Sequence, residues 1–375
     1  MRFGNVNAVE PSLREFVVAD DDTMFTSSRE LQERLASQKV FGATCLGMRG
    51  ALVRSMKFDW CIVDEASQIT IPGVIAPLLH ARKFVLIGDH QQLPPLVRSG
   101  EARKQGLEES LFQRLHAAHP EAVAELRIQY RMAADIQTVC NELVYSSRLS
   151  GGNRTVLSQT LFNLEPSDLA DLPAAQRAVL SLKSVVFIDT ATFPDKSETM
   201  EKLESEAIYN DFEAVVVGDM VRYLVMNAYP IDQVGVITPY KRQIRAIKAA
   251  IEDKLNKLPS VVAPVAVAKS KEDLEVSTVD KYQGKDKNCI FVSLVRCNEA
   301  HNVGELLSDW RRLNVAFTRA KAKLVVVGNS QTLSSSPFLR RFLQLCARRG
   351  WVESMACDGA MHPQLTQSLS SMFQF

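Results

Sequence analysis

The sequence predicts an α/β protein with two domains, each built on a parallel β-sheet. Short apolar segments, such as residues 60–63 and 84–87, run directly into polar residues, a pattern typical of parallel strands that are buried on both faces. Between such segments, apolar residues recur at helical spacing, most regularly along residues 244–258. A chain of 375 residues can bury a large core and is long enough for two domains.

The composition is that of an ordinary globular protein. Hydrophobic residues make up 46% of the chain and charged residues 23%. The net charge of +1 gives no overall nucleic-acid signal, so any basic track must be local. No apolar run is long enough to span a membrane, and the first residues do not form a signal peptide. We therefore expect a soluble, intracellular protein that does not contact membranes.

The seven cysteines show no CxxC spacing and mostly lie in apolar segments. This pattern predicts reduced core residues rather than zinc ligands or a disulfide framework. They are Cys45, Cys61, Cys140, Cys289, Cys297, Cys346 and Cys357.

Two of the predicted strands end in acidic residues. Residues 60–63 run into Asp64 and Glu65, and residues 84–87 run into Gly-Asp-His-Gln-Gln-Leu-Pro-Pro. In an open α/β sheet, chemistry collects at such strand ends. A carboxylate at Asp64 can hold Mg²⁺ through water, because Mg²⁺ keeps most of its hydration. Glu65 can polarise an attacking water, and Gln92 can sense a γ-phosphate. The alternative is a pair of core strands with acidic caps.

Asp-Glu-Ala-Ser and Gly-Asp-x-x-Gln-Leu-Pro resemble motifs II and III of superfamily-one helicases. The Ala-Ser form resembles the branch that moves 5′→3′ along a single strand. The resemblance implies tandem RecA-like P-loop NTPase domains with parallel sheets, which use ATP and Mg²⁺, with Asp64 at the metal and Asp89 at the nucleotide. We expect the first domain over residues 1–127, the second over residues 128–355, and a polar tail over residues 356–375.

The first part of the chain has weak signals. Residues 12–16 are weakly helical with no strand ahead of them, and residues 27–36 fit a helix capped by a serine. Residues 39–45 predict a short strand that ends near a hydroxyl group, Thr44. In the helicases that this chain resembles, a strand-end threonine contacts a nucleic-acid phosphate. The alternative role for Thr44 is a loop cap.

Residues 101–116 predict a helix, and the motif Gln-Tyr-Arg-Met follows at residues 129–132. This motif resembles motif IV, in which the arginine, here Arg131, reaches the nucleotide phosphates. The alternative is a surface arginine in a strand-to-helix turn. Residues 146–183 are rich in Ser, Asn, Gly, Asp and Pro and predict a loop or insert, to which we assign no chemistry.

A buried strand is predicted at residues 185–190, a long amphipathic helix at residues 204–227, and a further short strand that leads into Thr238, Pro239 and Tyr240. The helix after Tyr240 begins with free amides and two cations, which can bind a phosphate. The alternative is a capped surface helix. The resemblance implies that Thr238, Pro239 and Tyr240 contact the DNA backbone.

After a predicted loop over residues 258–273, residues 275–286 resemble motif V, and residues 288–294 form a strong strand pattern. The resemblance implies that Thr278 contacts DNA. Gly284 allows either close backbone approach to a phosphate or a turn with positive φ. Asp286 stands where the superfamily often has Glu and is assigned to the nucleotide site.

Residues 310–321 resemble motif VI. If this whole segment is helical, Arg312 and Arg319 lie two turns apart on one face. Arg319 then resembles a cis arginine finger, which stabilises charge on the γ-phosphoryl group, and Arg312 is assigned to the nucleotide. The alternative is a basic surface helix, which does not account for the apolar strand predicted at residues 324–327.

Three longer stretches, residues 88–97, 279–284 and 304–316, resemble the helicase part of the eukaryotic DNA replication ATP-dependent helicase/nuclease family. That resemblance implies action on 5′ flaps and DNA ends in the nucleus and sometimes in mitochondria. Its implied partners are single-stranded DNA, single-strand-binding protein and other replication and repair factors. RNA helicases of nonsense-mediated decay share the scaffold, but usually have Ser-Phe-Gln-Gly where this chain has Lys-Tyr-Gln-Gly at residues 281–284.

The pattern GxxxxGK[ST] occurs nowhere in the sequence, so the backbone nest and lysine that hold the β- and γ-phosphates are missing. We therefore expect a C-terminal piece of such an enzyme, whose first domain is incomplete at its N-terminus, poorly stable and inactive toward ATP alone. The nuclease domain and its iron–sulfur cluster are expected only upstream. The alternatives are a related RNA helicase and a catalytically inactive nucleic-acid-binding module.

Overall fold

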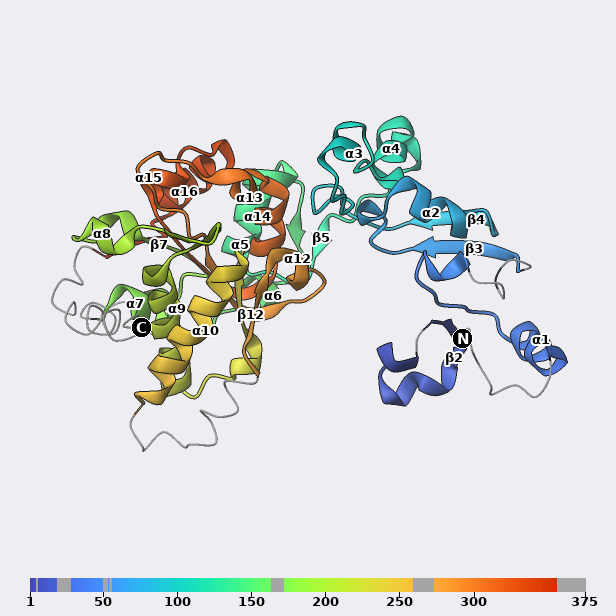
Figure 1. Ribbon diagram of the computed structural model, residues 1–375, viewed down its shortest axis with the longest axis horizontal. Helices are drawn as coiled ribbons and strands as arrows, with labels where there is room; N and C mark the ends of the chain where they lie inside the picture. Colours follow the sequence, from blue (N-terminus) through green and yellow to red (C-terminus); the bar gives the residue numbers. More distant parts are fainter. Residues whose placement is uncertain are drawn as a thin grey trace. The chain divides into compact units, whose positions relative to one another are not determined.

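The computed structural model divides into two compact units, Met1–Ala124 and Glu125–Phe375 (Figure 1). We describe each unit by itself, as unit 1 and unit 2. The domain boundary that we predicted from the sequence falls between residues 127 and 128. The structure describes residues 1–4, 6–18, 28–49, 53, 56–162, 172–258 and 273–355.

Unit 2 is organised around a six-stranded sheet in which every neighbouring pair is parallel. The strand order is β11-β10-β12-β13-β7-β14. The central strands are rich in Val, Ile and Phe and are buried almost throughout, as expected for strands covered on both faces. In sheet order the bounds are β11 Glu275–Thr278, β10 Val234–Thr238, β12 Lys287–Ser293, β13 Ala320–Gly328, β7 Val185–Asp189 and β14 Val352–Ser354.

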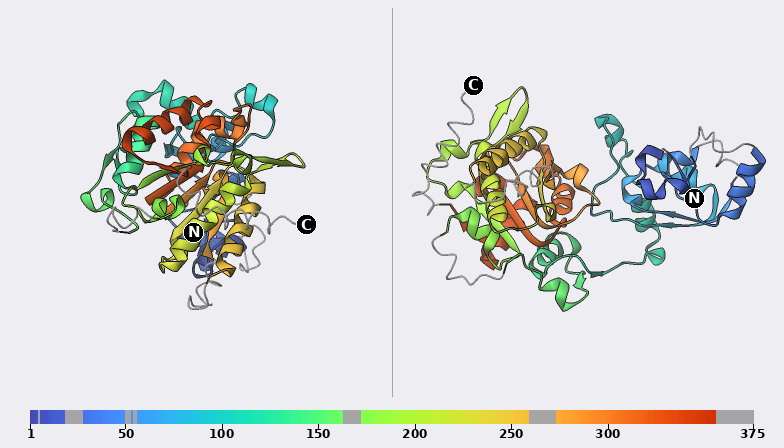
Figure 2. Two further views of the ribbon diagram at one scale, coloured as in Figure 1. Left: turned by 90° about the vertical axis from the view of Figure 1, so that its left-hand side faces the viewer. Right: turned by 90° about the horizontal axis from the view of Figure 1, so that it is seen from below.

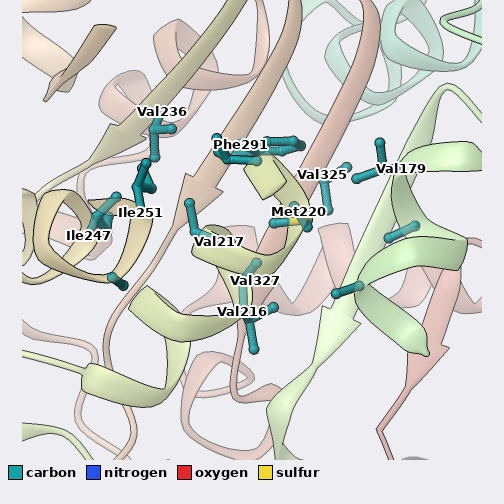
Figure 3. Packing of buried hydrophobic residues seen from close by; sticks show 14 of the residues in the cluster. Val179, Val216, Val217, Met220, Val236, Ile247, Ile251, Phe291, Val325 and Val327 are labelled. Carbon is teal, nitrogen blue, oxygen red and sulfur yellow. The ribbon is translucent and has the colours of Figure 1, made fainter. Parts of the chain in front are cut away.

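Helices lie on both faces of this sheet (Figure 2). Helices α7, α9 and α10 pack on one face, and α5, α14 and α16 contact strands β7, β12 and β13 from the opposite face. Alternate strand residues serve the two faces: Phe291 packs toward α9, whereas the ring of Phe187 meets Phe342 of α16. Figure 3 shows the first core, formed by Val236, Phe291, Val325 and Val327 of the strands with Val179, Val216, Val217, Met220, Ile247 and Ile251 of the helices.

Besides the sheet, the described residues of unit 2 form helices of 4 to 16 residues and four short strands. None of the helices that the structure describes is long and apolar enough to cross a membrane. Their bounds are α5 Ala134–Cys140, α6 Arg154–Leu157, α7 Ala174–Leu180, α8 Lys196–Thr199, α9 Asp211–Met226, α10 Lys241–Asn256, α12 Val279–Tyr282, α13 Gly304–Ser308, α14 Trp310–Phe317, α15 Ser330–Leu333 and α16 Pro337–Arg349, with strands β5 Ile128–Gln129, β6 Ser150–Gly151, β8 Lys202–Glu204 and β9 Ala207–Tyr209.

Unit 1 contains two small parallel pairs, β1 with β2 and β3 with β4. Strands β3 and β4 are the two predicted at motifs II and III, and they are parallel as expected. Their predicted burial is wrong: Ile62 is 67% exposed and Phe84 49% exposed. The bounds are β1 Arg2–Phe3, β2 Val17–Val18, β3 Phe58–Val63, β4 Ala81–Leu86, α1 Ser28–Ser37, α2 Ile71–Leu78, α3 Gly100–Lys104 and α4 Leu111–Ala118.

Several local predictions for unit 1 need correction. A two-residue strand, β1, precedes the first helical turn where none was expected. The predicted strand at residues 39–45 is reduced to a single bridge between Gly42 and Arg2. The helix predicted at residues 101–116 is broken into α3 and α4, because Gly106 adopts a positive φ of 88° that a helix does not allow.

In unit 2, the helix predicted at residues 204–227 begins only at Asp211, because Asn210 caps it: the Asn210 Oδ1 accepts a hydrogen bond from the Glu213 N–H at 2.9 Å. The preceding residues form a β8–β9 hairpin, whose two turn residues, Ser205 and Glu206, both have positive φ. Part of the predicted insert, α7, packs into the core.

Other predicted segments lie outside the described residues: 163–171 of the insert, 259–272 of the predicted loop, and the tail 356–375.

Candidate functional site

In unit 1, the turn after β3 places Asp64 and Glu65 at the carboxyl end of the strand. Glu65 adopts a left-handed conformation, with φ 51° and ψ 36°, which is uncommon for a residue other than glycine and is often retained at functional sites. The Asp64 Oδ1 accepts the Glu65 N–H at 2.9 Å, and the Glu65 Oε2 accepts the Gln68 amide at 2.6 Å. Both carboxylates remain exposed.

The loop after β4 is tied to this turn. The Ala66 N–H donates to the Ile87 carbonyl at 2.8 Å, and the Asp89 N–H donates to the Ser67 Oγ at 3.3 Å. The loops approach so closely that a Cβ at Gly88 would lie 3.0 Å from the Ser67 nitrogen. The Asp89 Oδ2 accepts the side-chain amide of Gln92 at 3.0 Å. The structure therefore brings motifs II and III together through their backbones and fixes Gln92 through Asp89.

In unit 2, Arg131 and Lys321 form a charged cluster with Asp286. The Asp286 carboxylate is 3.1 Å from the Arg131 Nε and 2.7 Å from the Lys321 Nζ. Burial raises the pKa of Asp286, but the hydrogen bond from Lys321 and the positive charges outweigh it and hold that pKa below its usual value. The Arg131 Nη1 also lies 3.5 Å from the Thr318 carbonyl. Motifs IV, V and VI thus meet at this carboxylate.

Arg319 is not on the helix where we predicted it. Helix α14 ends at Phe317, because Thr318 turns its hydroxyl back to the Asn314 carbonyl at 2.8 Å and β13 begins at Ala320. Arg319 is only 3% exposed. Its Nε donates to the Val315 carbonyl at 3.0 Å and its Nη2 to the Thr318 Oγ1 at 3.1 Å. The predicted shared helical face with Arg312 is therefore wrong.

Arg312 and Gly284 lie beside the same motifs. Arg312 is on α14 and reaches Asp280 of motif V at 3.4 Å and Asp309 at 3.3 Å. Gly284 adopts a positive φ of 79°, and a Cβ there would meet no atom within 4 Å. Of the two roles predicted for Gly284, this geometry supports the turn with positive φ.

The predicted DNA contacts of unit 2 gather at the carboxyl edge of the sheet. Thr238 and Thr278 are direct register partners at the ends of β10 and β11. Their side chains are largely buried, at 0% and 8% exposure. Tyr240 hydrogen-bonds Arg296 and burial raises its pKa. Pro239 and Tyr240 then lead directly into α10.

In unit 1, the Thr44 Oγ1 accepts the Gly47 N–H at 3.1 Å. That contact is the loop cap named above as the alternative for this residue, and its side chain stays exposed.

A buried polar network supports the sheet edge of unit 2, and the sequence did not reveal it. The Glu213 Oε2 accepts the Ser293 hydroxyl at 2.7 Å and the Val295 N–H at 2.9 Å, while its Oε1 has no partner among the described residues. Burial raises the pKa of Glu213 to about 7, against the opposing effect of these hydrogen bonds. Val295 has a positive φ of 72°, so the network holds a strained turn directly after β12.

Gln243 and Glu201 complete this support. Gln243 is fully buried, accepts the Asn210 N–H at 2.8 Å and donates to the Ser293 Oγ at 3.1 Å. Glu201 accepts from the Arg296 Nε at 2.9 Å and the Cys297 N–H at 2.8 Å. In the sequence, the only sign of this network is a glutamine within the first turn of a helix that otherwise begins with basic residues. No local pattern reveals the network, because the partners of Gln243 lie more than 30 positions away.

The tyrosine that distinguishes motif V from the RNA helicase pattern does not face a ligand. Tyr282 is fully buried, and its hydroxyl has no partner among the described residues. A Cβ at Gly235 would lie 1.9 Å from that hydroxyl, so the ring packs directly over the Gly235 backbone. Tyr282 therefore does not itself choose between DNA and RNA.

The carboxylate of Asp64 fits Mg²⁺, which prefers oxygen ligands and usually needs only one or two protein carboxylates beside water and phosphate oxygens. Within the described parts of the chain, no three His, Cys, Asp or Glu side chains converge as a ready metal site.

The chain matches two known protein families. Two families, each described as an AAA domain, match residues 107–331 and residues 14–100. The structure of a PRRSV helicase aligns with 89% of this chain and 48% of its own, at 12% identity and a TM-score of 0.38, which is too low to support an argument.

Curated relatives match nearly the whole chain. The DNA replication ATP-dependent helicase/nuclease JHS1 of Arabidopsis thaliana is 40% identical over 92% of this chain. DNA2 proteins with the same description are 36% identical over 96% in Saccharomyces cerevisiae and over 92% in Homo sapiens. The chain spans only 24%, 23% and 32% of these relatives. It belongs to the AAA-domain family, and over most of its length it is similar to the DNA replication ATP-dependent helicase/nucleases.

Proposed function

We propose that this chain is the motor portion of an ATP-dependent 5′→3′ DNA helicase within a replication and repair helicase/nuclease. The observation that carries the proposal is the convergence of motifs IV, V and VI on Asp286, in a chain whose relatives are described as DNA replication ATP-dependent helicase/nucleases. The proposed cofactors are ATP and Mg²⁺. An iron–sulfur cluster belongs to the nuclease region and is not assigned to any residue of this chain.

In unit 1, we assign Asp64 to Mg²⁺ through water and Glu65 to the attacking water. The hydrogen bond from Glu65 to Gln68 orients the carboxylate. Gln92 would sense the γ-phosphate, and Asp89 would position Gln92 for this role.

In unit 2, we assign Arg131 and Arg319 to the charge that develops on the transferred phosphoryl group. The Arg131 side chain is 41% exposed and needs only to exchange Asp286 for phosphate. Arg319 must first release the Val315 carbonyl and the Thr318 hydroxyl. Asp286 holds Arg131, Gly284 shapes the turn that carries Asp286, and Arg312 braces motif V through Asp280.

Single-stranded DNA is the proposed partner, bound along the sheet edge of unit 2 by Thr238, Pro239, Tyr240 and Thr278. In unit 1, considered by itself, Thr44 is a proposed backbone contact. Because Thr238 and Thr278 are largely buried, their neighbouring backbone amides would make most of the contacts. Such contacts carry little sequence information and depend on salt. Single-strand-binding protein and other repair factors are proposed further partners, in the nucleus and also in mitochondria.

The test uses two proteins, this chain and a longer version that carries a phosphate loop. The longer version should hydrolyse ATP, with stronger stimulation by single-stranded DNA than by RNA. The chain of residues 1–375 should bind single-stranded DNA in a salt-dependent manner and show no ATP turnover, because the phosphate-loop lysine is missing from the sequence. Stronger stimulation by RNA, or salt-independent and sequence-selective binding, would contradict the proposal.

A further inference from the structure

We infer that the solvent face of α10 is a second nucleic-acid contact, which continues the DNA track from the sheet edge along the side of unit 2. This inference rests on the proposed function. Lys241, Arg245 and Lys248 are all exposed, and their spacing of four and three residues places them on one side of the helix. We call these three residues the outer stripe. The opposite side of α10 is buried against α9 and the sheet.

Within the described part of the chain, the outer stripe differs from other cations of α10 in having no acidic side chain at ion-pair distance. Arg242 pairs with Glu204 at 2.8 Å, and Lys254 pairs with Asp219 at 2.7 Å. None of the acidic side chains that the structure describes lies within ion-pair distance of the outer stripe. Among the described residues, the stripe therefore carries three positive charges without an ion-pair partner over about 10 Å of helix.

The stripe also begins where positive charge is unfavourable for the helix. The amino end of a helix carries partial positive charge, so cations in the first turn oppose its dipole. Helix α10 has no acidic residue in its first turn and no side-chain cap from Tyr240. By contrast, α9 has an Asn210 cap and two acidic residues, Asp211 and Glu213, in its first turn. A local arrangement that disfavours the helix without visible compensation indicates a functional demand.

The phosphates of a nucleic-acid backbone would supply the negative charge that the outer stripe lacks. The stripe starts three residues after Thr238, where the proposed DNA track leaves the sheet edge, and α10 then runs across the face of the sheet beside α9 (Figure 1). Spaced phosphates can pair with cations one helical turn apart, whereas a fold-stabilising role would place acidic residues beside them. Continuity with the track favours DNA over an acidic protein segment as the partner.

The experiment compares three forms of the full 375-residue chain. The first is unchanged, the second carries Lys241→Gln, Arg245→Gln and Lys248→Gln, and the third is a charge-matched control with Arg340→Gln, Arg341→Gln and Arg348→Gln on α16. Binding is measured against salt concentration with oligothymidine probes of two lengths, one that covers only the sheet-edge track and one several times longer.

For the long probe, the stripe variant should lower the slope of log affinity against log salt by about 2, because each phosphate contact to a single strand contributes about 0.7. For the short probe, the slope of the stripe variant should match that of the unchanged chain. The control variant should match the unchanged chain on both probes. The stripe variant should also melt no lower than the unchanged chain, since it removes the charge of Lys241, which opposes the helix dipole in the first turn.

An unchanged slope for the stripe variant on the long probe would overturn the inference. An equal loss of slope in the control variant would also overturn it, because the effect would then depend only on the net charge of the chain. These outcomes leave the proposed function intact. Failure of the unchanged chain to bind either probe would instead contradict the proposed function, and the inference with it.

Discussion

Strands β3 of unit 1 and β12 of unit 2 have nearly the same sequence pattern and opposite burial. Cys-Ile-Val ends β3 and Cys-Ile-Phe-Val lies within β12, yet Ile62 is 67% exposed and Ile290 is fully buried. Among the described residues of unit 1, β3 pairs only with β4, whereas β12 lies between β10 and β13 and is covered by α9 and α14. An apolar run therefore predicts a strand, but the burial of that strand depends on the neighbours that the rest of the chain supplies.

The largest expected effects concern two proposed catalytic residues, Arg319 of unit 2 and Glu65 of unit 1. In a version of the enzyme that carries a phosphate loop, Arg319→Ala should lower ATP turnover by about 10³–10⁵-fold, as for other arginine fingers. Glu65→Gln should also stop turnover while ATP binding remains, because Glu65 is assigned to water rather than to the nucleotide. Steady-state ATPase rates and nucleotide titration measure both effects.

Matched controls exist in unit 2. Glu206→Gln changes another glutamate with positive φ, and Arg340→Ala changes an exposed arginine on α16. Both should leave turnover unchanged. Near wild-type turnover in Glu65→Gln or Arg319→Ala would show that the corresponding role is assigned to the wrong residue.

The next effect compares two phenylalanines on strands. Phe291 of β12 is fully buried and Phe84 of β4 is 49% exposed. Phe291→Ala should lower the free energy of unfolding by about 3–5 kcal/mol, because it leaves a cavity in a packed core. Phe84→Ala should cost about 1 kcal/mol, since half of its area is already in water. Urea unfolding of the two variants measures the difference, and equal losses would mean that the β3–β4 face is covered in solution.

The third effect is a pH dependence confined to unit 2. Burial gives Glu213 a folded-state pKa of about 7 against an ordinary value of 4.5, so the folded state holds the proton more tightly than the unfolded state. The stabilisation from this proton is full below about pH 4.5 and is lost as the pH rises through about 7. The loss amounts to about 3 kcal/mol.

Glu213→Gln keeps the shape of the side chain and cannot ionise. Its stability, measured by urea unfolding between pH 5 and 8, should fall less steeply with pH than that of the unchanged chain. Glu206→Gln, which is exposed, should keep the steeper fall. The same slope in all three proteins would show that Glu213 does not carry the proton.

Much of the fold followed from local patterns in the sequence. The apolar runs located β3, β4, β7, β10, β12 and β13, because short apolar runs that end in polar residues are typical of parallel strands, whether or not the strand is then covered. The acidic turn after β3 and the Gln92 loop were found for the same reason: polar residues that stop such strands stand out. The edge that carries Thr238 and Thr278 followed from the parallel arrangement itself.

What the sequence did not predict depends on contacts between distant residues. The partners of Asp286 are Arg131 and Lys321, which lie 155 positions before it and 35 positions after it. The end of α14 before Arg319 is set by Thr318 and by the start of β13, not by helix propensity. The exposure of Ile62 reflects missing neighbours, which no pattern within β3 could reveal.

The most direct test of this comparison is amide hydrogen exchange on the 375-residue chain, read strand by strand. We predict slow exchange in β7, β10, β12 and β13, because their hydrogen bonds are buried on both sides. Exchange should be much faster in β3 and β4, whose outer edges have no strand partner among the described residues. Equal protection of the two sets of strands would contradict the conclusion that β3 and β4 lack the covering neighbours that bury β12.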